Sequence, residues 1–155
     1  MKKITLLVAM LFATLTIAQN IKIVEIDADQ TSTDDMEFLE ILTESSNQSL
    51  NGYIVVFYNG NSDQSYRTLD LTGFSSDSNG YFIIGSDLFP GADIIMGPDN
   101  TIQNGADAIA IYSADAANFP DGTSVTSSGL VDAVVYGTSD DDDVELLTGL
   151  NQTTQ

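Results

Sequence analysis

Residues 53–58 read Tyr-Ile-Val-Val-Phe-Tyr and are followed by Asn59-Gly60, a pair typical of a tight turn. All six side chains are apolar or aromatic, so the segment has no polar face to turn towards water. Because neighbouring side chains of a β-strand point to opposite faces, such a run predicts a central strand that is covered on both sides.

The sequence on either side has a similar pattern, in which short β-branched and aromatic runs are separated by Gly, Asn, Asp and Ser. After residue 19 no segment repeats apolar residues at helical spacing, so we expect almost no helix there. Eight short strands with regular turn signals predict an all-β sandwich or barrel that forms a single domain. The expected strands are residues 21–27, 37–42, 53–58, 66–71, 81–84, 93–96, 106–112 and 130–136.

The connection at residues 113–129 is unusually long for a compact domain. It is either a functional loop or a surface loop that Phe119 pins to the domain, with a helical turn at residues 115–118.

Taken in order, six segments of the chain resemble the bacterial lamin-tail domain, an immunoglobulin-like β-sandwich of exported proteins. The resemblance implies a non-catalytic module that acts in attachment, often joined to exported nucleases or adhesive domains, and it brings no catalytic residues with it. The matching segments are residues 23–27, 37–41, 50–53, 80–85, 107–112 and 131–137.

Two features depart from the family pattern. Family members usually carry Asn before the first Glu, where this chain has Val24, and they usually continue with a further strand, where this sequence reaches Gln155 in a polar stretch. The resemblance therefore implies a domain at residues 19–155 that is truncated at its C-terminal end.

The N-terminus has the pattern of a secretory signal peptide. Lys2 and Lys3 precede an apolar run at residues 4–15, and small residues follow up to Ala18. The run is shorter than the roughly 20 apolar residues of a membrane anchor. We expect a signal peptide at residues 1–18 that forms a helix, and a secreted or cell-surface bacterial protein.

The charge of the chain is strongly one-sided. It has 4 Lys and Arg residues against 23 Asp and Glu residues, for a net charge of −19. Such a surface repels nucleic-acid phosphates and anionic lipids, so direct binding to nucleic acid, or to a membrane after signal cleavage, is disfavoured. The expected partners are a protein or a surface glycan, and small cations.

Catalysis finds little support in the composition. The chain has neither Cys nor His, which excludes the usual nucleophile–base pairs and the commonest transition-metal ligands. A glycosidase needs only two carboxylates and is not excluded on this ground. We expect no enzyme but a binding or anchoring module; the alternatives are a carbohydrate-binding module and the accessory domain of an exported nuclease or other hydrolase.

One acidic cluster has the donor chemistry of a structural calcium site. Hard carboxylate oxygens from a loop and its flanking strands suit the coordination that Ca²⁺ takes in proteins. In the alternative, whichever glutamate faces the core accepts backbone N–H groups, and the aspartates stay solvated. The calcium candidates are Glu25, Asp27, Asp29, Asp34, Asp35 and Glu37.

Two further patterns leave alternatives open. The run Asp140–Asp143 is by default a solvated loop, although it could complete an ion site with Asp115 or Asp121. The tyrosines and phenylalanines are explained equally well by core packing and by a platform that stacks on sugars. The six tyrosines are Tyr53, Tyr58, Tyr66, Tyr81, Tyr112 and Tyr136.

Overall fold

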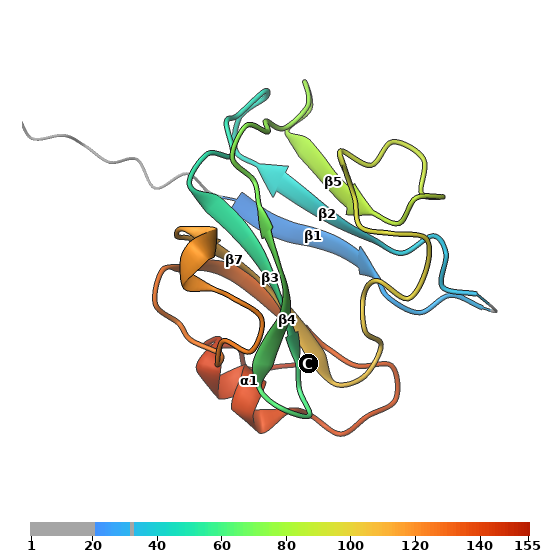
Figure 1. Ribbon diagram of the computed structural model, residues 1–155, viewed down its shortest axis with the longest axis vertical. Coiled ribbons are helices and arrows are strands. Elements are labelled where there is room, and N and C mark those ends of the chain that lie inside the picture. Colours follow the sequence, from blue (N-terminus) through green and yellow to red (C-terminus); the bar gives the residue numbers. More distant parts are fainter. Residues whose placement is uncertain (1–20, 32) are drawn as a thin grey trace, which may run out of the picture.

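The computed structural model describes residues 21–31 and 33–155, so the predicted signal peptide lies outside the described residues. The described chain forms eight strands, one short 3-10 helix and one short α-helix (Figure 1). In chain order they are β1 (Ile21–Asp27), β2 (Phe38–Thr43), β3 (Tyr53–Asn59), β4 (Gln64–Asp70), β5 (Tyr81–Gly85), β6 (Ile94–Ile95), β7 (Asp107–Ser113), η1 (Ala116–Asn118), β8 (Leu130–Tyr136) and α1 (Val144–Gly149).

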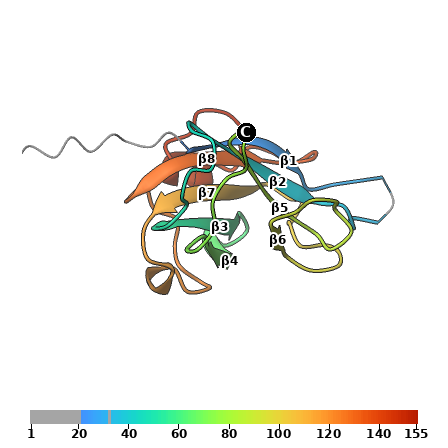
Figure 2. The same ribbon diagram turned by 90° about the horizontal axis from the view of Figure 1, so that it is seen from above.

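The strands form two sheets of four, which we call the first sheet (order β1-β2-β5-β6) and the second sheet (order β4-β3-β7-β8). Figure 2 shows both rows of strands, with β1 beside β8. Neighbouring strands are antiparallel except β5 and β6, which run parallel. Immunoglobulin-like domains likewise place strands A, B and E in one sheet and C, F and G in the other. The predicted sandwich is confirmed, with every strand within two residues of its expected bounds.

Strands β3 and β7 are buried on both faces, as the run at residues 53–58 predicts. Val55 and Phe57 of β3 point between the two sheets, into a core shared with Leu39 and Phe82 of the first sheet. The alternate residues of β3, among them Val56, point the other way into a second apolar cluster. The second sheet therefore has an apolar layer on each side.

The long loop and α1 cover the outer side of the second sheet. Phe119, next to η1, packs its ring 4.8 Å from that of Tyr112, and the Tyr112 hydroxyl donates to the carbonyl oxygen of Thr126 at 2.7 Å. Leu146 and Leu150 at the C-terminal helix are fully buried in the same cluster. In Figure 1, η1 and α1 lie on the side of β3 and β7, away from β5. Residues 113–129 thus form the pinned surface loop, with the expected helical turn at residues 115–118.

The helix α1 was not predicted from the sequence. The last residue of the aspartate run, Asp143, caps the helix by accepting the N–H of Leu146 at 2.8 Å. Asp140, Asp141 and Asp142 are exposed, as the solvated-loop interpretation expects. The helix is only 6 residues long, so it shows too little of the 3.6-residue period to be found by pattern alone.

A β-bulge resolves the conflict between apolar and acidic residues in β1. Ile21 and Ile23 face the core with the expected alternation, and continued alternation would bring Glu25 into the core as well. The register shifts between Ile23 and Glu25, so Ile26 packs against the core and Glu25 stands outside. The free edge of β1 meets β8, where the N–H of Ile23 donates to Asp132 Oδ2 at 2.8 Å.

The apolar residues of the expected strands predict a buried core, and four of its predicted members are only half-buried: Phe38, Val134 and the alternatives Ile23 and Ile26. Phe38 is half-buried on the outer side of the first sheet, where its ring stacks on that of Phe89 at 4.3 Å. Val134 of β8 is also half-buried, as are Ile23 and Ile26, although all three pack against the core. The remaining predicted core residues are buried: Leu39, Ile54, Val56, Phe57, Phe82, Ile84, Ile109, Ile111 and Val135.

Truncation of two phenylalanines tests this assignment. We expect Phe57→Ala to lower the free energy of unfolding by about 3–5 kcal/mol, because a fully buried ring leaves a cavity. Phe38→Ala should cost clearly less, because its ring lies outside the core and keeps contact with water. Urea denaturation of both variants measures the difference, and equal losses would contradict the burial of Phe57 relative to Phe38.

Candidate functional site

Buried and half-buried polar side chains surround residues 97–106. We call these residues the crossover segment because they lead from β6 in the first sheet to β7 in the second. A segment that leaves the hydrogen-bonding ladders of both sheets must satisfy its backbone groups elsewhere. Glu37, Tyr66, Tyr136 and Asp107 do so from four different places in the fold.

Glu37 holds the middle of the crossover segment from just before β2. Its carboxylate is fully buried and accepts the N–H of Thr101 at 2.5 Å, the hydroxyl of Thr101 at 2.8 Å and the N–H of Ile102 at 3.1 Å. Leu39 and Ile41 point to the core, so the alternation of β2 brings Glu37 to the core side and leaves Glu40 outside. The glutamate forced inward is therefore paired with backbone and hydroxyl donors.

Two tyrosines hold Gln103 at both of its backbone groups. The N–H of Gln103 donates to the hydroxyl of Tyr66 at 3.1 Å, and its carbonyl accepts the hydroxyl of Tyr136 at 2.7 Å. Burial raises the pKa of Tyr66 to about 12 and also raises the pKa of Tyr136, so both phenols stay protonated at neutral pH. Gln103 thus has a fixed backbone position.

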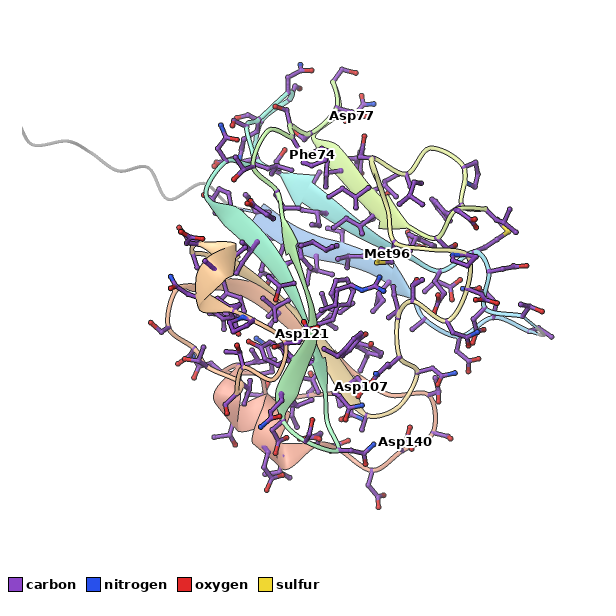
Figure 3. The ribbon with its side chains drawn as sticks, in the orientation of Figure 1. Phe74, Asp77, Met96, Asp107, Asp121 and Asp140 are labelled. Atoms are coloured by element: carbon purple, nitrogen blue, oxygen red, sulfur yellow. The ribbon has the colours of Figure 1, made fainter. Side chains whose placement is uncertain are left out.

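Asp107 joins the end of the crossover segment to the β3–β4 turn. Its side chain is 3% exposed and accepts the N–H of Gly60 at 2.9 Å and that of Gly105 at 3.1 Å. Burial raises the pKa of Asp107 against the lowering effect of these two hydrogen bonds, and the nearby carboxylates of Asp140 and Asp143 raise it further. Figure 3 shows Asp107 and Asp140 at the same end of the sandwich.

A pocket of about 300 Å³ opens between the crossover segment and the β3–β4 turn. The Nδ2 of Asn59 donates to Oε1 of Gln103 at 2.5 Å, which links its two walls. Most of the lining is amide and backbone, and its one carboxylate already accepts two N–H groups. The lining residues are Asn59, Asn61, Asn100, Ile102, Gln103, Asn104, Gly105 and Asp107.

The calcium candidates occupy several different environments. Glu25 stands on the outer side of the first sheet, Asp29 is exposed, and Asp34 accepts the N–H of Gln30 at 2.8 Å. Asp27 and Asp35 are half-buried, and Glu37 holds the crossover segment. Within residues 21–31 and 33–155, no three carboxylates come together closely enough to hold a metal ion, and this includes the aspartate run with Asp115 or Asp121.

The six tyrosines do not share one exposed face. Tyr58 and Tyr112 are fully buried, and their hydroxyls lie 3.0 Å apart in the second apolar cluster. Tyr53, Tyr66 and Tyr136 are half-buried, whereas Tyr81 of the first sheet is 38% exposed. Core packing accounts for the buried members, and they cannot form a flat platform for sugar rings.

The outer side of the first sheet is a second candidate surface. Glu25 of β1 stands directly opposite Glu40 of β2, which in turn stands opposite Ile83 of β5. Two residues along β2, on the same side, Leu42 pairs with Tyr81. Partial burial raises the pKa of Glu40, and the charges of Glu25 and Asp77 raise it further. Lys22 of β1 is exposed and pairs with Leu42 on the same side. We call Lys22, Glu25, Phe38, Glu40, Leu42, Tyr81 and Ile83 the outer face of the first sheet.

Sequence reasoning did not single out the residues that shape the pocket. Asp107 appears in the sequence as one of 23 acids, at the start of an otherwise apolar strand. The available signal was an acidic residue at the first position of an apolar strand, because a carboxylate buried there must find hydrogen-bond donors. Gln103 carried no comparable signal.

Comparison of the chain with protein-family models, with curated proteins and with solved structures found no match. In the part of the chain that the structure describes, no helix is long and apolar enough to cross a membrane.

The Glu37 contacts predict a specific loss of stability. We expect Glu37→Gln to lower the free energy of unfolding by about 1–3 kcal/mol, because an amide nitrogen replaces one of two accepting oxygens and leaves a buried donor unpaired. Glu44→Gln, at an exposed position after β2, is the control and should change stability little. Urea denaturation measures both variants, and equal losses of stability would contradict the role of Glu37 in holding the crossover segment.

The calcium hypothesis is tested by thermal melting with calcium and with chelator, both at high NaCl so that general screening is matched. Because hydrogen bonds already satisfy the buried Glu37, we expect equal melting temperatures. A structural ion would instead add about 2.7 kcal/mol at a hundredfold excess over its Kd. A shift of that kind, lost in Asp27→Asn or Asp29→Asn, would overturn the expectation.

Proposed function

We propose that this chain is a non-catalytic, exported binding module that attaches to a protein partner through the outer face of the first sheet. The observation that carries the proposal is an asymmetry between the two sheets. Residues 113–129 and α1 cover the outer side of the second sheet, whereas Phe38, Leu42 and Ile83 of the first sheet lie outside both apolar clusters.

The composition of the outer face suits a protein partner. Tyr81 is 38% exposed beside Leu42. A partner that buries apolar surface of this kind removes it from water, and this favours binding. Glu25 and Glu40 lie in the same patch, so the best complement is a surface with apolar side chains and at least one Lys or Arg. The lamin-tail resemblance, which implies attachment, agrees with this proposal.

The non-catalytic part of the proposal is supported by how the two buried acids are used. The two buried carboxylates of the crossover segment, Glu37 and Asp107, accept backbone N–H groups. A glycosidase would need one carboxyl free to give a proton and another to attack or to activate water. Export through residues 1–18 completes the proposal.

Site-specific photo-cross-linking in the exporting cell tests the function. A benzophenone side chain at Tyr81 should cross-link to a discrete protein, whereas one at Val144, which is 63% exposed on α1, should not. The Tyr81 cross-link should disappear in Ile83→Asp, which places a charge in the middle of the outer face. The same cross-linking from both positions, or none from Tyr81, would contradict attachment through this face.

A further inference from the structure

The amide-lined pocket beside the crossover segment has the properties of a binding site that is separate from the outer face of the first sheet. Its walls come from the end of β3, the β3–β4 turn and residues 100–107, so segments far apart in the sequence meet there. Figure 3 places Asp107 at this end of the sandwich and Phe74 at the opposite end.

The pocket is held in shape before any ligand arrives. Asp107 ties both rims together through the N–H groups of Gly60 and Gly105, and two tyrosine hydroxyls fix the backbone of Gln103. A Cβ at Gly60 would collide with the carbonyl oxygen of Ala106, so the turn packs tightly against the crossover segment. Binding therefore costs little loop ordering, which is what a preorganised site requires.

Turn geometry explains only part of the amide content. Asn100 adopts a left-handed backbone with φ of 47°, and Asn104 precedes a glycine, so both serve the turns themselves. Asn59 is the last residue of β3 and Gln103 is half-buried, and neither has a positive φ. Their mutual hydrogen bond uses Nδ2 of Asn59 and Oε1 of Gln103. Oδ1 of Asn59 therefore keeps its capacity to accept, and Nε2 of Gln103 keeps its capacity to donate, in two residues that both line the pocket.

The chemistry of the lining selects the ligand. Amides donate and accept hydrogen bonds without charge, which is the complement of neighbouring hydroxyl groups. No Lys or Arg lines the pocket, and Asp107, Asp140 and Asp143 make its surroundings negative, so anions are disfavoured. At about 300 Å³ the pocket stands at the lower end of ligand sites and has room for one ring.

We propose that this pocket binds one neutral pyranose residue of a glycan. Oδ1 of Asn59 and Nε2 of Gln103 hold two adjacent sugar hydroxyls, and Asn61 closes the rim from the β3–β4 turn. This site lies apart from the outer face of the first sheet, so the test of sugar binding does not depend on the proposed attachment to protein.

The experiment titrates the ¹⁵N-labelled chain of residues 19–155 with glucose, galactose, mannose and N-acetylglucosamine, each to about 100 mM, because single sugars bind weakly in small open sites. We expect at least one sugar to give saturable shifts of the side-chain amides of Asn59 and Gln103, with that of Asn118 in η1 unmoved. If none of the four sugars gives saturable shifts of these amides, the proposal is wrong. It is also wrong if calcium chloride alone shifts them and the sugars do not, because the pocket would then bind a cation.

Variants separate the pocket from general effects. Gln103→Ala and Asn61→Ala should each weaken the responding sugar at least tenfold, and Asn118→Ala should leave its affinity unchanged. Asn61 is exposed, so its variant keeps the test valid even if Gln103→Ala unfolds. Undiminished binding in a folded Asn61→Ala variant would overturn the assignment. Cross-linking at Tyr81 reports on the other surface and does not depend on this result.

Discussion

The antiparallel pairing of β3 with β7 places apolar side chains on both sides of the second sheet, and much of the remaining chain serves to cover them. The inner side packs on the first sheet, as in any two-layer sandwich. The outer side needs a third layer, which the long loop and α1 supply through Phe119, Leu146 and Leu150. Small residues of β7, Ala108 and Ala110, leave room there for aromatic rings.

The need to cover the outer side of the second sheet also determines which outer side of the sandwich stays exposed. Among the described residues, the longest loop and the α-helix both lie over the second sheet, and neither covers the first. On the outer face of the first sheet, Phe38 is partly covered because it stacks on Phe89. Leu42 and Tyr81 stay in contact with water. The asymmetry follows from the apolar pattern of the strands, and the proposed attachment surface is its consequence.

A second constraint comes from charge. With 4 cations in the whole chain, a buried carboxylate has few chances to find an ion-pair partner, and an unpaired buried charge is very costly. Glu37 and Asp107 both meet this constraint by accepting N–H groups. Thr101, Ile102 and Gly105 of the crossover segment supply all of these N–H groups except that of Gly60 in the β3–β4 turn. The hydrogen bonds that satisfy the acids therefore also hold the crossover segment and both rims of its pocket in place.

The sequence predicts the parts of this fold that rest on local pattern. Runs of β-branched and aromatic residues mark the strands to within two residues, and the doubly apolar run at residues 53–58 marks β3 as buried on both faces. The bulge in β1, the outward position of Phe38 and the clamp at Asp107 depend on which strands become neighbours. Such long-range pairings leave no periodic signal, so the pocket emerges only from the three-dimensional structure.

The pair of Glu25 and Glu40 shows how the outer face differs from an ordinary solvated sheet. Like charges directly opposite each other on neighbouring strands destabilise the pairing, and an Arg or Lys at either position would relieve the repulsion. The bulge at Val24 turns Glu25 outward, but it does not require a second acid across from it. Departures from a local rule of stability are expected at functional sites, and this pair lies on the proposed attachment surface. A basic side chain of the proposed partner, placed between the two glutamates, would remove the repulsion on binding, and the local cost to the free domain would then add to the affinity of the complex.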